Sequence, residues 1–92
     1  MSLNEDMFEA VTNGDCQKLA ALINANAIVD ARDDQDGTPL HLAAFQGNTA
    51  AVEVLISARA TVDVREDENW TPLQCAIDAG RIMAAQLLIK AK

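Results

Sequence analysis

Apolar residues recur along the middle of the chain with the three- and four-residue spacing of a short amphipathic helix. Leu40 and Ala43 share one face of this pattern, which is the arrangement of a helix packed on one side. Thr38 is a good N-cap, and Pro39 falls at the first helical position, where its missing N–H costs nothing. Gly47 supplies the left-handed residue that commonly ends a helix. The pattern therefore predicts a helix between Thr38 and Gly47.

A second apolar helix follows at once. Asn48 or Thr49 can act as its N-cap, and Val52, Leu55 and Ile56 repeat the same spacing. Helices of about nine or ten residues do not persist alone in water. Each must therefore be stabilised by its neighbours.

The pattern changes after the second helix. Residues 27–31 and 60–64 alternate in polarity and carry β-branched side chains, so we expect extended chain there. Residues 32–36 and 65–69 that follow are rich in turn formers. Asp36 and Asn69 hold equivalent places, and both residue types tolerate a positive φ. The unit is helix, tight turn, helix and a hairpin-like finger.

This unit is repeated. Thr38–Ala43 returns 33 residues later as Thr71–Ala76. Five positions are identical in all three copies: Ala10/Ala43/Ala76, Gly14/Gly47/Gly80, Leu22/Leu55/Leu88, Ile23/Ile56/Ile89 and Ala25/Ala58/Ala91. A fixed period of this length indicates stacked units. We predict an all-α solenoid of helix pairs at roughly 9–23, 38–57 and 71–90, with the three glycines in equivalent environments and Leu55 buried on both sides.

The unit resembles the ankyrin repeat. The middle copy carries the family pattern in Thr38–His41, Gly47 and the Ala60–Asp63 finger, and the third copy departs from it with Gln74 in place of His. The resemblance covers nearly the whole chain and implies one domain, 1–92, with repeats at approximately 1–32, 33–65 and 66–92. The first copy has Glu5–Phe8 instead of Thr-Pro-Leu-His and resembles an N-terminal capping repeat.

Two departures affect the ends of the units. The family usually has Gly where Asn26 and Arg59 stand, and Arg59 should cost about 0.5–1 kcal/mol if its φ is positive. The chain stops at Lys92 without a third finger, and Ile82 and Met83 lie on its last helix. The third copy is therefore an imperfect cap, or the chain is a fragment of a longer ankyrin-repeat protein. We expect a monomer, or weak self-association through this edge.

Charge narrows the range of partners. The net charge is −7, and residues 30–36 and 63–68 contribute −3 each. This concentration disfavours nucleic acid and anionic membranes, which bind clustered Lys and Arg. The chain has no apolar stretch of the ~20 residues that a membrane span requires, and no secretory signal is visible in its first residues. We expect Cys16 and Cys75 to be two small buried thiols in the first and third units, as in a cytoplasmic protein.

The residues do not predict an enzyme. His41 is the only histidine, and the resemblance places it in a turn, bonded to backbone and Thr38. The segment Asp34–Gly37 is superficially similar to a calcium loop, but Arg32 and Ala43 stand where acidic ligands are required. A hydrolase would need a positioned pair of carboxylates, and none is evident. We expect no catalytic residue, metal or cofactor.

The resemblance implies a protein-recognition module that binds on its concave face, at the finger tips and the end of the first helix. Phe45 and Trp70 are candidate anchors for a partner, although they could equally pack only on each other. The alternative function is a regulatory inhibitor that covers a partner enzyme. Because the fingers are acidic, we expect a partner with a basic surface and an apolar centre. The partner-binding residues carried over are Asp34, Gln35, Gly37, Phe45, Gln46, Asp67, Glu68, Trp70, Asp78 and Ala79.

Overall fold

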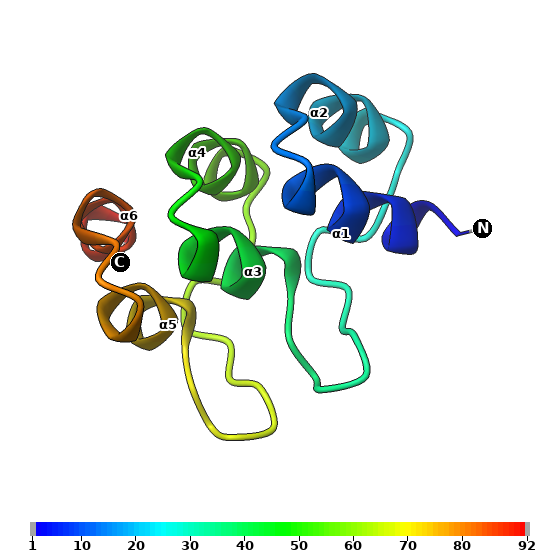
Figure 1. Ribbon diagram of the computed structural model, residues 1–92. Coiled ribbons are helices and arrows are strands. Elements are labelled where there is room, and N and C mark those ends of the chain that lie inside the picture. Colours follow the sequence, from blue (N-terminus) through cyan, green and yellow to red (C-terminus); the bar gives the residue numbers. More distant parts are fainter. Residues whose placement is uncertain (1, 92) are drawn as a thin grey trace.

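The computed structural model describes residues 2–91, in which all regular structure is helical. Its helices are α1 (Leu3–Thr12), α2 (Cys16–Asn24), α3 (Pro39–Gln46), α4 (Thr49–Ser57), α5 (Pro72–Asp78) and α6 (Ile82–Lys90). Consecutive helices form antiparallel pairs that stack in chain order (Figure 1). The helices α1, α3 and α5 contact one another in one layer, and α2, α4 and α6 form the other. The predicted solenoid of three helix pairs is confirmed.

Several helices begin and end at the residues that the sequence indicates. Thr38 and Thr71 are N-caps whose side chains accept from the third helical amide, with proline at the first helical position of each helix. Gly14, Gly47 and Gly80 have φ of 70°, 71° and 72°. The three glycines therefore share the same left-handed backbone conformation, although Gly47 alone lies against the side chain of Arg81.

The predicted start of the first helix pair, near residue 9, is wrong. Helix α1 begins at Leu3, because Ser2 caps it: Ser2 Oγ accepts from the amide of Glu5, 3.1 Å away. The Glu5 carboxylate in turn accepts a hydrogen bond from the backbone amide of Ser2, which completes a capping box. A Ser followed three residues later by Glu is a known helix start, and this signal precedes the apolar repeat.

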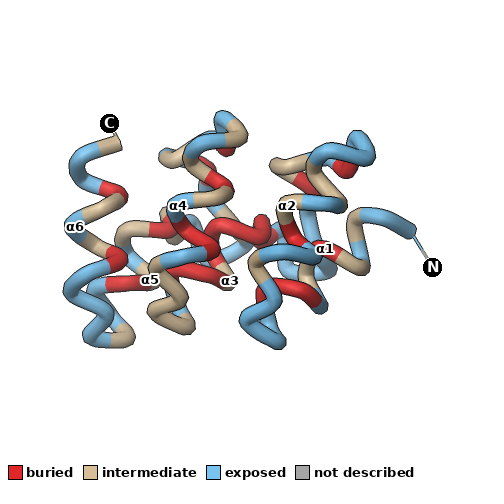
Figure 2. Tube along the Cα trace, turned by 90° about the horizontal axis from the view of Figure 1, so that it is seen from above, coloured by how far each residue is buried: buried red, intermediate tan, exposed pale blue. Residues whose placement is uncertain are grey.

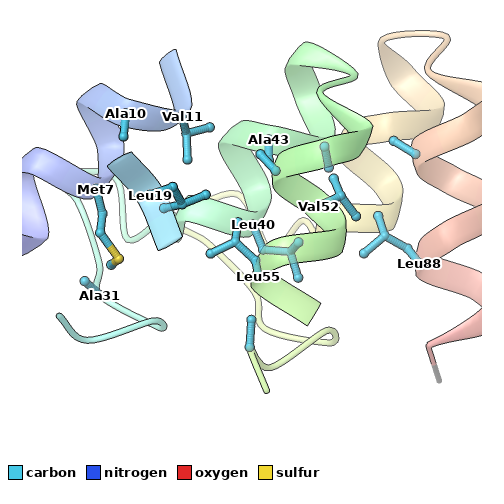
Figure 3. Packing of buried hydrophobic residues seen from close by; sticks show 14 of the residues in the cluster. Met7, Ala10, Val11, Leu19, Ala31, Leu40, Ala43, Val52, Leu55 and Leu88 are labelled. Atoms are coloured by element: carbon cyan, nitrogen blue, oxygen red, sulfur yellow. The ribbon is translucent and has the colours of Figure 1, made fainter. Parts of the chain in front are cut away.

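The core lies between neighbouring pairs. Figure 2 shows the buried positions concentrated between helices and the exposed ones along the outer sides. Leu55 has no exposed surface and belongs to the cluster of Figure 3 together with Leu19, Leu40 and Leu88. The expectation that Leu55 is fully buried is therefore confirmed.

Repetition alone does not identify core positions. Ala10, Ala43 and Ala76 are all buried, but Ile89 is 58% exposed although it stands in an invariant column. Ala25, in another such column, is also exposed, because it lies at the end of α2 next to the left-handed residue Asn26. Some repeated positions therefore preserve the end of a helix rather than the core.

The fingers project from one side of the stack (Figure 1). The first finger comprises residues 27–38 and the second residues 60–71. The expected extended chain is only partly present, since residues 29–30 and 62–63 form turns. Instead of pairing as strands, the fingers bond to each other: the Asp30 carboxylate accepts from Thr61 N at 2.9 Å and from Thr61 Oγ1 at 2.7 Å.

The C-terminal edge of the stack is partly apolar. Ile82 and Met83 are exposed, as expected. For Met83, however, the exposure does not come from a missing neighbouring pair. Its counterparts Gln17 and Ala50 are exposed as well, although another helix pair follows each of them. The position that an additional pair would cover is that of Ile77, which is 63% exposed. Its counterparts Val11 and Ala44 are buried.

Candidate partner-binding groove

A groove of about 400 Å³ lies between the two fingers and the helices α3 and α5. We call it the inter-finger groove. Leu42, Phe45 and Trp70 give it apolar surface, and Asp33, Glu66, Glu68 and Asp78 line it with carboxylates. No Lys or Arg belongs to the lining. The site is thus an acidic groove with exposed apolar atoms.

Two of these carboxylates hold the fingers in shape. Asp33 Oδ1 accepts from the amides of Gln35 and Gly37, both at 2.9 Å. Glu66 Oε1 does the same in the second finger, accepting from Glu68 N at 2.8 Å and Trp70 N at 3.0 Å. These charges are already engaged by backbone amides, so they are poorer ligands for a partner.

Four other carboxylates, in the finger tips and on helix α5, are available. The side chains of Asp34, Asp67, Glu68 and Asp78 are exposed and make no hydrogen bond or ion pair with any residue in 2–91. Asp36, in contrast, is ion-paired with Arg32 at 3.1 Å. Fewer carboxylates are therefore free to pair directly with a partner than the acidic composition of the fingers suggests.

His41 links the two fingers. Its Nδ1 lies 3.1 Å from Thr38 N, which is a fixed donor, so Nδ1 must be the acceptor. The proton is then on Nε2, which donates to the carbonyl of Trp70 at 2.8 Å. The assignment follows because a neutral imidazole has one donor and one acceptor nitrogen. The structural role predicted for His41 is confirmed, and His41 fixes the backbone position of Trp70.

The thiol of Cys75 also lines the groove. Burial and the nearby Glu66 and Asp78 carboxylates raise the pKa of this thiol from 9.0 to about 11. The thiolate, which is the reactive form of cysteine, is thus suppressed at neutral pH. Both cysteines are free thiols. We expected both to be buried, but both are half-buried.

The structure brings together many of the residues carried over from the family resemblance. Gln35, Gly37, Phe45, Glu68, Trp70 and Asp78 all line the inter-finger groove. Asp34 lines a second hollow, on the other side of the first finger. Asp67, Gln46 and Ala79 line neither hollow.

The two aromatic anchors differ in exposure. Phe45 is 54% exposed at the end of α3, which agrees with its position outside the core. Trp70 is half-buried, and its backbone is held on both sides, since its amide donates to Glu66 in the second finger and its carbonyl accepts from His41 on α3. Its ring still contributes to the groove.

Sequence reasoning missed Leu42 and Cys75, which line the groove from α3 and α5. They are equivalent positions, 33 residues apart and one residue after His41 and Gln74. The repeat register was the signal that could have found them. Within residues 2–91, no group of three or more His, Cys, Asp or Glu side chains is arranged to hold a metal ion.

A family model described as ankyrin repeats, in three copies, matches residues 7–92. The chain belongs to the ankyrin-repeat family. Ankyrin repeats are generally protein-interaction modules and generally not enzymes. Comparison with curated proteins gave no match. None of the helices described in residues 2–91 is long and apolar enough to span a bilayer.

Proposed function

We propose that this chain is a non-enzymatic recognition module that binds a protein partner in the inter-finger groove. The observation that supports this is the composition of the groove, which combines apolar atoms of Phe45 and Trp70 with four carboxylates and has no cation in its lining. Such a surface complements a partner with a basic rim and an apolar centre. The free thiols of both cysteines fit a reducing compartment, and we place the chain in the cytoplasm.

The two parts of the groove have different roles in binding. Exposed charges are screened over about 8 Å at physiological salt, so Glu68 and Asp78 mainly speed the encounter with a basic partner. Affinity then depends on the apolar contacts of Phe45 and Trp70, which exclude water. The alternative function, a regulatory inhibitor, would use the same contacts. It differs in that the partner enzyme loses activity on binding.

The test uses a library of Lys- and Arg-rich peptides with apolar centres, screened for binding at low salt. For the peptides selected, we expect Trp70→Ala to weaken binding by about 2 kcal/mol, or roughly thirty-fold. Ile82→Ala, which removes an exposed apolar side chain outside the groove, is the matched control.

Association kinetics test the charges separately. Glu68→Gln should slow association and flatten its dependence on salt, whereas Glu53→Gln, which removes a charge from the exposed surface of α4, should have less effect. A library without binders, or Trp70→Ala and Ile82→Ala variants of equal affinity, would contradict the proposal.

A further inference from the structure

A second hollow, of about 710 Å³, lies between the start of α1 and the first finger. We call it the N-terminal hollow. Phe8 and Leu42 provide its apolar surface, and Glu5, Asp33 and Asp34 provide its carboxylates. The inter-finger groove has the same combination of apolar surface and acidic walls.

The two hollows are related by the repeat. Asp33 and Gln35 of the N-terminal hollow correspond, 33 residues later, to Glu66 and Glu68 of the inter-finger groove. Leu42 corresponds in the same way to Cys75. Two hollows built from equivalent positions lie one helix pair apart, which is about 8–10 Å for packed helices.

The hollows are also adjacent. Asp33, Gln35 and Leu42 line both of them, so the first finger forms a shared wall. A ligand that leaves the inter-finger groove across this finger therefore enters the N-terminal hollow.

Charge favours a cation in the N-terminal hollow. The one cation in its lining is Arg32, and this guanidinium is already engaged. It donates to the carbonyls of Asp36 and Arg65, each at 2.8 Å, and is ion-paired with the Asp36 carboxylate. Asp34 has no hydrogen bond or ion pair within residues 2–91, so its carboxylate can receive a basic group.

We propose that the N-terminal hollow is a second subsite for the same partner, and that the bound segment is an extended basic peptide crossing the first finger. An extended chain advances about 3.3 Å per residue, so two residues three positions apart span the distance between the hollows. The segment places one Lys or Arg in each hollow. This inference rests on the proposed function, because the first of the two cations occupies the inter-finger groove.

The experiment compares three synthetic peptides that share an apolar centre. One has arginines three positions apart, one has the same composition with adjacent arginines, and one has a single arginine. Binding is followed at low salt by calorimetry and by the fluorescence of Trp70, the only tryptophan in the chain. The peptide with arginines three positions apart should bind most tightly, since its two contacts act on one molecule.

Variants assign the subsites. Asp34→Asn should weaken the peptide with spaced arginines roughly three- to five-fold, the size of an exposed ion pair, and leave the single-arginine peptide unchanged. Glu68→Gln should weaken all three peptides, and Glu53→Gln should weaken none. Asp34 is exposed and makes no hydrogen bond or ion pair within residues 2–91 that its loss would break, so Asp34→Asn should melt like the parent protein.

The outcomes separate the two proposals. If none of the three peptides binds, the proposed function fails together with this inference. If the single-arginine peptide binds through Trp70 and Glu68 while a second arginine adds nothing at any spacing, the proposed function stands and the second subsite is wrong. A preference for adjacent arginines, or for a peptide that is helical when bound, also overturns the extended segment.

Discussion

At the scale of single residues, the structure separates charges and polar groups that the sequence presents as equal. Asp33 and Glu66 are bonded to the amides of their own turns, whereas Asp34 and Glu68 have free carboxylates. Both pairs belong to the same acidic segments, so composition cannot tell them apart. The local hydrogen bonds decide which carboxylates support the fold and which can meet a partner.

His41 and its counterpart Gln74 differ in their hydrogen bonds in a way that can be tested. The local contact of His41 with Thr38 has a counterpart in the third copy, where Gln74 Oε1 accepts from Thr71 N at 2.9 Å. Only His41 also bonds to the next finger, through Trp70. His41→Ala should therefore cost about 1–3 kcal/mol of unfolding free energy, the price of leaving buried polar groups without partners. Gln74→Ala, measured by the same urea titration, should cost less. Equal losses would show that the link to Trp70 contributes nothing.

Cys75 gives a prediction that depends on pH. In a Cys16→Ser background, alkylation of the folded protein should rise with the thiolate near pH 11, and in denaturant near pH 9. The folded state disfavours the thiolate, so this thiol's contribution to stability is complete below pH 9 and is lost as the pH rises toward 11. Asp78→Asn should lower the pKa of Cys75, because the Asp78 carboxylate raises it. Identical rate profiles for the folded and the denatured protein would contradict the assignment.

At the scale of helices and turns, each second helix ends at a residue in the left-handed conformation. Asn26 and Arg59, where the family usually has glycine, have φ of 74° and 69°. Asparagine tolerates this conformation, but arginine is strained in it. Arg59→Gly should therefore stabilise the protein by about 0.5–1 kcal/mol, and Asn26→Gly by less. The midpoints of urea unfolding measure both. An Arg59→Gly variant less stable than the parent would mean that the arginine side chain makes a compensating contact.

Much of the helix and turn structure could be predicted from the sequence, because caps and turns depend on residues that are close together in the chain. Thr38, Pro39 and Gly47 identify the middle helix by their chemistry alone. The fingers were harder to predict, since Asp30 and Arg32 bond to residues of the next unit. The groove was predicted only in part for the same reason. The position of Phe45 follows from its non-core column. The backbone of Trp70, in contrast, is bonded to His41, 29 positions away in the sequence.

At the scale of the whole molecule, stability depends on stacking between neighbouring pairs. Contacts link α1 to α3, α3 to α5, α2 to α4 and α4 to α6. Among the pairs described in residues 2–91, the central one therefore has a neighbouring pair on each side. In such an array stability is approximately a sum of unit and interface terms, so a defect in the central pair affects both interfaces.

Leu55, on the central helix α4, tests this arrangement. Its side chain has no exposed surface, so Leu55→Ala should cost about 2–5 kcal/mol of unfolding free energy. That is comparable with the roughly 5 kcal/mol total of a marginally stable domain, and the variant should be largely unfolded at physiological temperature. Glu53→Ala changes an exposed side chain on the same helix and should leave the melting temperature nearly unchanged. Circular dichroism during heating compares the two variants directly. Because the fingers that form the groove are joined to this central pair, Leu55→Ala should lose peptide binding and helical signal together. If helicity disappeared while binding persisted, the groove would not depend on the stack.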